Sequence, residues 1–104
     1  MSNWIDAGRQ DSLAAGEHVV IDVDGDTVAV FNVDGVYHAI RDVCTHDGAE
    51  IASGRLDGCE IVCPRHGARF CLKTGKALTA PAYEDMATYP VRIHDGRIQV
   101  GEPT

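Results

Sequence analysis

Asp-Gly dipeptides between short runs of β-branched and apolar residues constrain the fold of this chain more than any other feature. An Asp-Gly pair flanked by such runs is the strongest short-range signal for a β-hairpin. Three pairs, Asp24-Gly25, Asp34-Gly35 and Asp95-Gly96, have these runs on both sides. The runs are residues 17–23, 26–33, 36–41, 89–94 and 97–101. They predict an all-β fold, an antiparallel β-sandwich or barrel.

A second, smaller group of turn signals lies between these hairpins. Asp57-Gly58 precedes residues 59–63, and the run at residues 69–72 leads into Thr74-Gly75. This pattern predicts a smaller set of hairpins, inserted at about residues 41–72 into a basal β domain formed by the remainder. The chain has no internal repeat, low-complexity tract or linker, so we expect residues 1–104 to form a single domain.

The charge of the chain restricts its partners. Asp and Glu number 16 and Lys and Arg 9, which gives a formal net charge of -7. Nucleic acid phosphates would repel such a protein, so we expect no nucleic acid partner. The same charge favours a protein partner with a basic docking face.

The first residues of the chain, its longest apolar stretches and its cysteines indicate the cellular compartment. The first residues lack the basic region and the apolar run of a signal peptide, and no stretch has the roughly twenty apolar residues that span a bilayer. We therefore expect a cytoplasmic protein with no membrane contact. Cysteines stay reduced in the cytoplasm, which favours metal ligation over disulfides. The four cysteines are Cys44, Cys59, Cys63 and Cys71.

Two short segments each offer one thiolate and one imidazole. Cys44-Thr45-His46 and Cys63-Pro64-Arg65-His66 are separated by the sixteen residues 47–62. Zinc sites with two Cys and two His usually draw a pair of like ligands from each segment, whereas here each segment is mixed. The mixed pairs suit a two-iron, two-sulfide centre whose ends differ chemically. A structural zinc-binding module remains an alternative.

These motifs resemble the signature of Rieske-type [2Fe-2S] proteins, and the similarity extends over about residues 4–100. Within that group the chain looks most like the small ferredoxins of bacterial aromatic-ring-hydroxylating dioxygenase systems. The resemblance implies one Rieske-type [2Fe-2S] cluster per chain. It also implies that Cys44 and Cys63 ligate one iron and that His46 and His66 ligate the other. Residues 78–82 resemble the proline-containing loop that covers the cluster in this family.

The resemblance also implies a function. We expect a one-electron carrier, a monomer, that takes electrons from a flavin-dependent NAD(P)H reductase and delivers them to a terminal oxygenase. It should not itself be an enzyme, because an oxygenase needs a second, mononuclear iron site on a catalytic domain, for which 104 residues leave no room. The main alternative is the small Rieske-like subunit of a nitrite reductase or of another oxidoreductase complex.

The neighbours of the motif indicate where in the Rieske range the reduction potential lies. High-potential members have an additional Cys in each loop, forming a disulfide, and Ser and Tyr hydroxyls that donate hydrogen bonds to the cluster. The corresponding residues here are Ala49, Arg65, Ala68 and Phe70, none of which can replace those functions. We therefore predict a potential of roughly -150 mV, near the lower limit for Rieske centres.

The remaining cysteines and histidines have ordinary expected roles. Cys59 and Cys71 lie outside the motif, and we expect buried or half-buried thiols that pack as small hydrophobic side chains. The three other histidines lack a Cys at ligand spacing, and we expect them to occupy ordinary strand positions. They are His18, His38 and His94.

Overall fold

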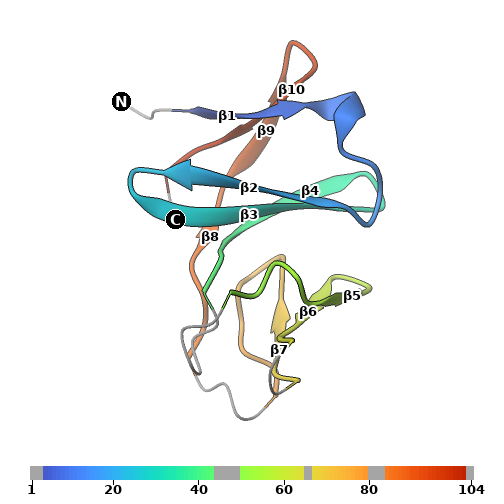
Figure 1. Ribbon diagram of the computed structural model, residues 1–104, viewed down its shortest axis with the longest axis vertical. Coiled ribbons are helices and arrows are strands. Elements are labelled where there is room, and N and C mark those ends of the chain that lie inside the picture. The colour runs from blue at the N-terminus through green and yellow to red at the C-terminus, as the bar shows by residue number, and fades with distance from the viewer. Residues whose placement is uncertain (1–3, 44–49, 65–66, 80–83, 103–104) are drawn as a thin grey trace.

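Three antiparallel β-sheets make up the fold of the computed structural model, which describes residues 4–43, 50–64, 67–79 and 84–102. The predicted all-β, antiparallel fold is confirmed (Figure 1). One sheet has the order β1-β10-β9, the second β2-β3-β4-β8 and the third β5-β6-β7. The strands are β1 (Ile5–Arg9), β2 (His18–Val23), β3 (Asp26–Val33), β4 (Val36–Arg41), β5 (Arg55–Asp57), β6 (Glu60–Val62), β7 (Arg69–Cys71), β8 (Thr88–Tyr89), β9 (Val91–His94) and β10 (Arg97–Val100). A single 3-10 turn, η1 (Gln10–Ser12), is the helical element among the described residues.

The Asp-Gly pairs form the turns that the sequence predicts. Asp24-Gly25 connects β2 to β3, Asp34-Gly35 connects β3 to β4, and Asp95-Gly96 connects β9 to β10. In each pair both residues have positive φ, near 51° for Asp34 and 89° for Gly35, for example. Positive φ at both central residues defines a type I′ turn, whose twist matches that of the flanking strands. The three predicted hairpins are therefore confirmed.

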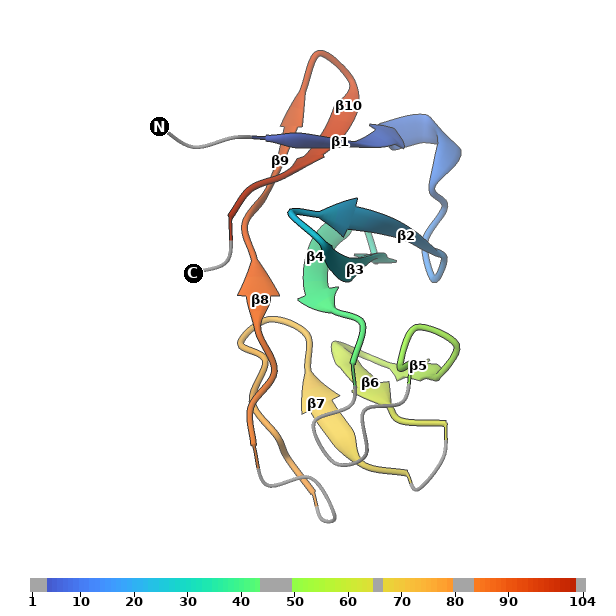
Figure 2. The same ribbon diagram turned by 60° about the vertical axis from the view of Figure 1, so that its left-hand side comes forward.

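The sheet β2-β3-β4-β8 is the middle layer of the molecule (Figure 2). Along β3, Val28 and Val30 face the sheet β1-β10-β9, whereas Ala29 and Phe31 face the sheet β5-β6-β7. All four are at most 1% exposed, which explains why β3 reads as an almost continuous apolar run. A strand buried on both faces thus supplies side chains to two cores.

Two cores follow from this layering. The basal core consists of Ala7, Leu13, Val23, Val28, Val30, Ala39, Tyr89, Ile98 and Val100. The small-sheet core consists of Ala29, Phe31, Ile40, Ile51, Ala52, Ile61, Cys63, Ala68, Phe70, Leu72 and Met86. The small sheet is therefore not an independent unit, because β3 and β4 of the middle sheet form one wall of its core.

Strand β1 lies outside every strand run predicted from the sequence. It pairs with β10, and its register shifts between Asp6 and Gly8, where Gly8 has a φ of 110°. A glycine at such a bulge adopts this φ without steric cost. The predicted run at residues 89–94 is also divided, because Pro90 separates β8, which pairs with β4, from β9, which pairs with β10. Since proline has no N–H to donate, the chain changes sheets at that point.

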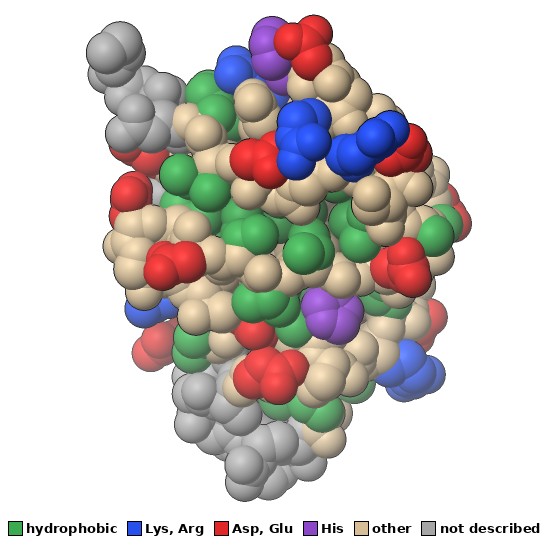
Figure 3. All heavy atoms as spheres, turned by 45° about the horizontal axis from the view of Figure 1, so that its top comes forward, with side chains coloured by type: hydrophobic (Ala, Val, Ile, Leu, Met, Phe, Trp, Pro, Cys, Tyr) green, Lys and Arg blue, Asp and Glu red, His purple; other side chains and the backbone are tan. Residues whose placement is uncertain are grey.

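Charged side chains are interspersed with apolar ones on the face that carries β1, β9 and β10 (Figure 3). Two of the basic residues there are paired with carboxylates: Arg97 Nε donates to Asp6 Oδ1 at 2.6 Å, and Arg9 Nη2 donates to Asp11 Oδ2 at 2.8 Å. In the part of the chain that the structure describes, no helix has the length and hydropathy needed to cross a membrane.

Candidate metal centre

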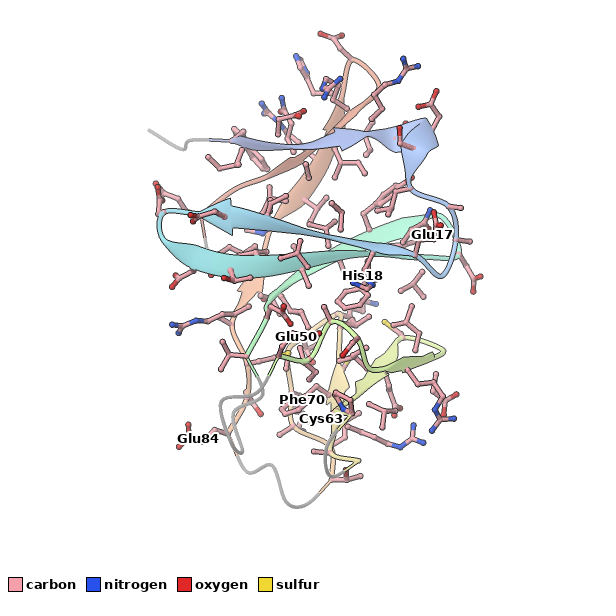
Figure 4. The ribbon with its side chains drawn as sticks, viewed as in Figure 1. Glu17, His18, Glu50, Cys63, Phe70 and Glu84 are labelled. Atoms are coloured by element: carbon pink, nitrogen blue, oxygen red, sulfur yellow. The ribbon has the colours of Figure 1, made fainter. Side chains whose placement is uncertain are left out.

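Cys63, the one predicted ligand that the structure describes, directly follows β6 and is 1% exposed. It lies in the small-sheet core together with Phe70 (Figure 4). Its backbone N–H donates to the carbonyl oxygen of Ala68 at 2.7 Å, and its own carbonyl accepts from Gly67 N at 3.1 Å. Gly67 has a φ of 74°, in the left-handed region where glycine carries no steric penalty. Cys63 therefore stands at the start of a hydrogen-bonded reversal between β6 and β7.

The other three predicted ligands, Cys44, His46 and His66, lie outside the described residues. Their assignment therefore stays a prediction. Their neighbours in the sequence are described, and these show how the segments that carry the ligands are anchored. His66 belongs to the same connection between β6 and β7 that Cys63 begins.

Asp42 joins the two ends of the segment that contains Cys44 and His46. Its carboxylate oxygen Oδ1 accepts hydrogen bonds from the backbone N–H groups of both Ile51 and Ala52, each at 2.8 Å. The side chain is only 7% exposed, and its own backbone N–H donates to Thr27 of the middle sheet. A buried carboxylate that accepts two backbone N–H groups forms strong, charge-assisted hydrogen bonds. Asp42 thus closes the base of residues 43–50.

This closure brings the two motif-bearing parts of the chain to one core. Ile51, which Asp42 holds, is a member of the small-sheet core, and so is Cys63. Ile51, five residues after the first motif, and Cys63 of the second motif therefore lie in the same apolar core. Sequence reasoning missed Asp42. The only local signal for this role is that Asp42 directly follows a strand. Aspartate in such a position commonly accepts hydrogen bonds from nearby backbone N–H groups.

A third segment is anchored beside β7. Leu78 N–H donates to Arg69 O at 2.8 Å, and Arg69 N–H donates to Thr79 Oγ1 at 3.0 Å. Ala77 N–H donates to Asp85 Oδ1 at 2.8 Å, which holds the chain on both sides of residues 80–83. Residues 80–82, the larger part of the predicted covering loop, lie outside the described residues.

Ala68 and Phe70 are fully buried and lie in the same core as Cys63. Neither side chain has a hydrogen-bond donor, as the prediction of a low potential requires. The other two residues on which that prediction depends, Ala49 and Arg65, lie outside the described residues.

The remaining histidines do not assemble a second centre. His18 packs against Phe31 with ring centroids 5.5 Å apart. His94 Nε2 lies 3.4 Å from Oδ2 of the exposed Asp95. His38 is half-buried, and its Nε2 is 3.9 Å from Cys59 Sγ. Across residues 4–43, 50–64, 67–79 and 84–102, no group of three or more His, Cys, Asp or Glu side chains has the arrangement of a metal site. The described residues therefore provide no zinc site away from the predicted motif.

Comparison with known families decides between a Rieske cluster and a structural zinc site. Residues 3–90 match the Rieske [2Fe-2S] domain. The chain belongs to this family. Its cofactor is a Rieske-type [2Fe-2S] cluster, as the mixed Cys and His pairs predict. The buried Cys63 fits such a group, since an apolar surrounding keeps water away from a ligand sulfur.

Individual relatives define the role more closely. The chain is 42% identical, over 98 residues that are 94% of each chain, to the ferredoxin component of the naphthalene 1,2-dioxygenase/salicylate 5-hydroxylase systems of Ralstonia sp. Among solved structures it matches a chain from the complex of reduced oxygenase and oxidized ferredoxin in carbazole 1,9a-dioxygenase. That match has a TM-score of 0.92 and 28% identity, and it covers 97% of this chain and 95% of the other. The protein is thus a Rieske-type ferredoxin, an electron-transfer component rather than an enzyme.

One further structure matches almost as well. It is the putative NADH-dependent nitrite reductase small subunit from Mycobacterium tuberculosis, with a TM-score of 0.88 and 30% identity. The match covers 98% of this chain and 96% of that one. The Rieske domain is therefore shared with subunits of another kind of oxidoreductase.

Proposed function

We propose that this ferredoxin carries single electrons from a flavin-dependent NAD(P)H reductase to the terminal oxygenase of a ring-hydroxylating dioxygenase system. The observation that carries the proposal is the end-to-end match with a ferredoxin component, in which 94% of each chain is aligned. We also propose that it acts as a monomer and shares the cytoplasm with the reductase, where NAD(P)H is available.

Within the chain, we assign Cys44 and Cys63 as ligands to one iron and His46 and His66 as ligands to the other. The cluster-binding subdomain is placed at about residues 41–72. The burial of Cys63 and the closure by Asp42 support this assignment, because Asp42 holds Ile51 in the same core as Cys63. When bound, the cluster supplies a one-electron couple at a potential above that of plant-type ferredoxins.

A pair of serine variants tests the assignment. Cys63→Ser should abolish cluster binding, because a serine hydroxyl is a poor substitute for a thiolate ligand. Iron and acid-labile sulfide in the freshly purified protein should fall to background, and the visible absorption should disappear. Cys59→Ser is the matched control, since Cys59 packs against the same core without belonging to the motif. Full iron content in Cys63→Ser, or zinc in the wild-type protein, would contradict the assignment.

Electron delivery is tested by reconstitution. Purified reductase, NAD(P)H, this ferredoxin and the oxygenase of a dioxygenase system should together oxidise the aromatic substrate. Omission of the ferredoxin should reduce the rate to background. If the oxygenase turns over equally well without the ferredoxin, the proposal is wrong.

A second candidate function follows from the match to the nitrite reductase small subunit. In that case the chain would be a permanent subunit rather than a carrier. A tagged chain purified from its own organism distinguishes the two. A stoichiometric complex that persists through gel filtration favours the subunit, and a free chain favours the carrier.

A further inference from the structure

A cavity of about 270 Å³ lies where β4 and the chain that leaves the middle sheet separate. β8 pairs with β4 over two residues, and the chain then continues into β9, which pairs with β10 instead (Figure 2). Pro90 and Val91 line the cavity, together with Tyr37 and His38 of β4 and with Lys73, which lies just after β7. The volume corresponds to about nine water molecules of about 30 Å³ each, which leaves room for a small ion.

The edge of β4 directs a backbone donor to this cavity. Arg41 N–H donates to Ala87 O at 3.1 Å, on the side of β4 that faces β8. Backbone groups alternate between the two edges of a strand, so Tyr37, four residues earlier, directs its N–H to the same side. Among the described residues of β4, Ala39 and Ile40 are the ones paired with β8, and Tyr37 has no strand opposite it there. No sheet ladder therefore uses the Tyr37 N–H.

Basic side chains line the cavity without an acidic one. Lys73 and His38 belong to the lining, whereas no Asp or Glu is among the described residues that line it. Lys73 forms no ion pair within the described part of the chain. His38 Nε2 lies 3.9 Å from Sγ of the half-buried Cys59, and Nδ1 has no hydrogen-bond partner among the described residues. In a chain with a net charge of -7, this cavity is a local site of positive charge.

Two other cavities lack this property. One is lined by Arg9 and Asp11, which form an ion pair at 2.8 Å. Another is lined by Arg41 together with Glu84 and Asp85. In both, carboxylates already balance the basic side chains. The cavity beside His38 differs because its positive charge is available to a ligand.

We propose that this cavity binds a small oxyanion, a phosphate or carboxylate group that accepts hydrogen bonds from the Lys73 ammonium and the Tyr37 N–H. Charge-assisted hydrogen bonds of this kind are stronger than neutral ones. Leu72, Pro90 and Val91 in the lining can pack against a small apolar group attached to the oxyanion. The proposal concerns the free ferredoxin and does not depend on the identity of its redox partners.

His38 makes this binding depend on pH. Burial lowers the pKa of His38, and the charge of Lys73 lowers it further. A bound anion favours the imidazolium and so raises this pKa, which means that binding takes up protons and strengthens as the pH falls. The β3 residue paired with His38 is the uncharged Phe31. The titratable groups around the imidazole are the Lys73 ammonium, the Cys59 thiol and the phenol hydroxyls of Tyr37 and Tyr89.

Calorimetric titration of the holoprotein tests the proposal and distinguishes the two sources of the oxyanion. Sodium benzoate and sodium phosphate are titrated separately, at low salt and in a buffer free of oxyanions. At least one should bind saturably with a Kd of a few millimolar or below, about what a few charge-assisted hydrogen bonds at an open site supply. Tighter binding of benzoate identifies a carboxylate with an apolar body as the ligand, and tighter binding of phosphate identifies a phosphate group. Absence of saturable binding of both up to about 20 mM would overturn the proposal.

The two lysines of the chain provide a test that needs no variant. Lys73 and Lys76 are both exposed and lie in the same turn after β7, but Lys73 lines the cavity and Lys76 does not. Reductive methylation of the holoprotein, followed by peptide mass spectrometry, gives the rate at each lysine. The tighter ligand, at ten times its Kd, should slow methylation of Lys73 about tenfold and leave Lys76 unchanged. Equal protection of the two lysines would show that the anion does not bind in this cavity.

Variants test the role of each basic side chain. Lys73→Gln should weaken binding about tenfold, since a hydrogen bond between charged groups is lost. Lys76→Gln removes the same charge from the same turn and should have little effect, and equal weakening by the two variants would contradict the proposal. Benzoate stays ionised well above the carboxyl pKa of about 4, so its affinity should rise between about pH 8 and pH 6 in the wild-type protein and much less in His38→Gln. An equal rise in His38→Gln would show that His38 does not take part.

Discussion

At the scale of single residues, the candidate centre depends on side chains that bind backbone N–H groups and so fix the position of the chain around it. Asp42 carries no cluster chemistry, but its one carboxylate oxygen fixes Ile51 and Ala52 and thereby the base of the first motif. The two N–H groups have no sheet partner at this point, so they depend on that oxygen. The stability of the site is therefore sensitive to a residue that is not a ligand.

Replacing Asp42 by alanine leaves two buried N–H groups without an acceptor, at a cost of about 1–3 kcal/mol each. We expect the half-life of the visible cluster band at a fixed urea concentration to shorten at least about 30-fold. Asp42→Asn keeps an acceptor oxygen of the same shape and should retain most of the half-life. Equal half-lives for Asp42→Ala and the wild-type protein would show that the closure is not needed.

The reduction potential is also decided by individual side chains. Ala68 and Phe70 offer no hydrogen-bond donor, and the reduced cluster therefore lacks stabilisation that hydroxyl groups give in high-potential relatives. We expect protein-film voltammetry of the holoprotein to give roughly -150 mV. Phe70→Tyr should raise the value by tens of millivolts, since a hydrogen bond of about 1 kcal/mol corresponds to about 40 mV for one electron. A clearly positive potential for the wild-type protein would refute the prediction.

At the scale of elements, the small sheet holds Cys63 through close backbone packing. Gly54 precedes β5, and a Cβ added there would overlap the carbonyl oxygen of Val62, the residue before Cys63. No flexible side chain can move aside to relieve such a clash. The close approach of residue 54 to the carbonyl oxygen of Val62 thus requires glycine at position 54.

Gly54→Ala should consequently displace the end of β6 and weaken cluster binding. We expect the purified variant to contain less than half of the wild-type iron, because overpacking against backbone costs typically 1–3 kcal/mol or more. Ser53→Ala, at the neighbouring exposed residue, is the matched control and should keep its full iron content. Normal iron in Gly54→Ala would mean that the backbone shifts there at no cost to the site.

The same elements show what the sequence can and cannot predict. The hairpins at Asp24-Gly25 and Asp34-Gly35 are predictable, because two adjacent residues determine the turn and the alternation beside it determines the strands. β1 is not, because its pairing with β10 joins residues about ninety positions apart and its own residues include Gly8. The closure by Asp42 and the contact between His38 and Cys59 span only 9 and 21 positions, but they escape prediction because they depend on how separate elements fold together, which no local residue pattern specifies. The ligand pairs can be predicted from the sequence because metal chemistry restricts residue types at short spacing, and their assignment stays a prediction.

At the scale of the whole molecule, electrostatics should govern encounters with redox partners. The net charge of -7 favours a basic docking surface, and such association slows as salt screens the charges. Exposed carboxylates flank the segments that emerge from the small-sheet core: Glu50 follows residues 44–49 and Glu84 follows residues 80–83. Both are labelled in Figure 4, as is Glu17, which immediately precedes β2. A partner that approaches the cluster would meet Glu50 and Glu84 before it meets Glu17.

Charge reversal tests this arrangement with a closely matched control. Glu50 Oε1 accepts the N–H of Ser53 at 2.7 Å, and Glu17 Oε1 accepts the N–H of Ala14 at 2.8 Å, so each exposed carboxylate supports one local turn. Glu50→Lys and Glu17→Lys therefore change the charge by the same amount and lose the same kind of hydrogen bond.

In stopped-flow measurements of electron transfer to the oxygenase at low salt, Glu50→Lys should lower the association rate constant about tenfold and Glu17→Lys much less. The difference should disappear at high salt, because the Debye length falls to about 3 Å at 1 M. Equal effects of the two variants would show that only the net charge steers the encounter, and a rate that does not respond to salt would exclude electrostatic docking altogether.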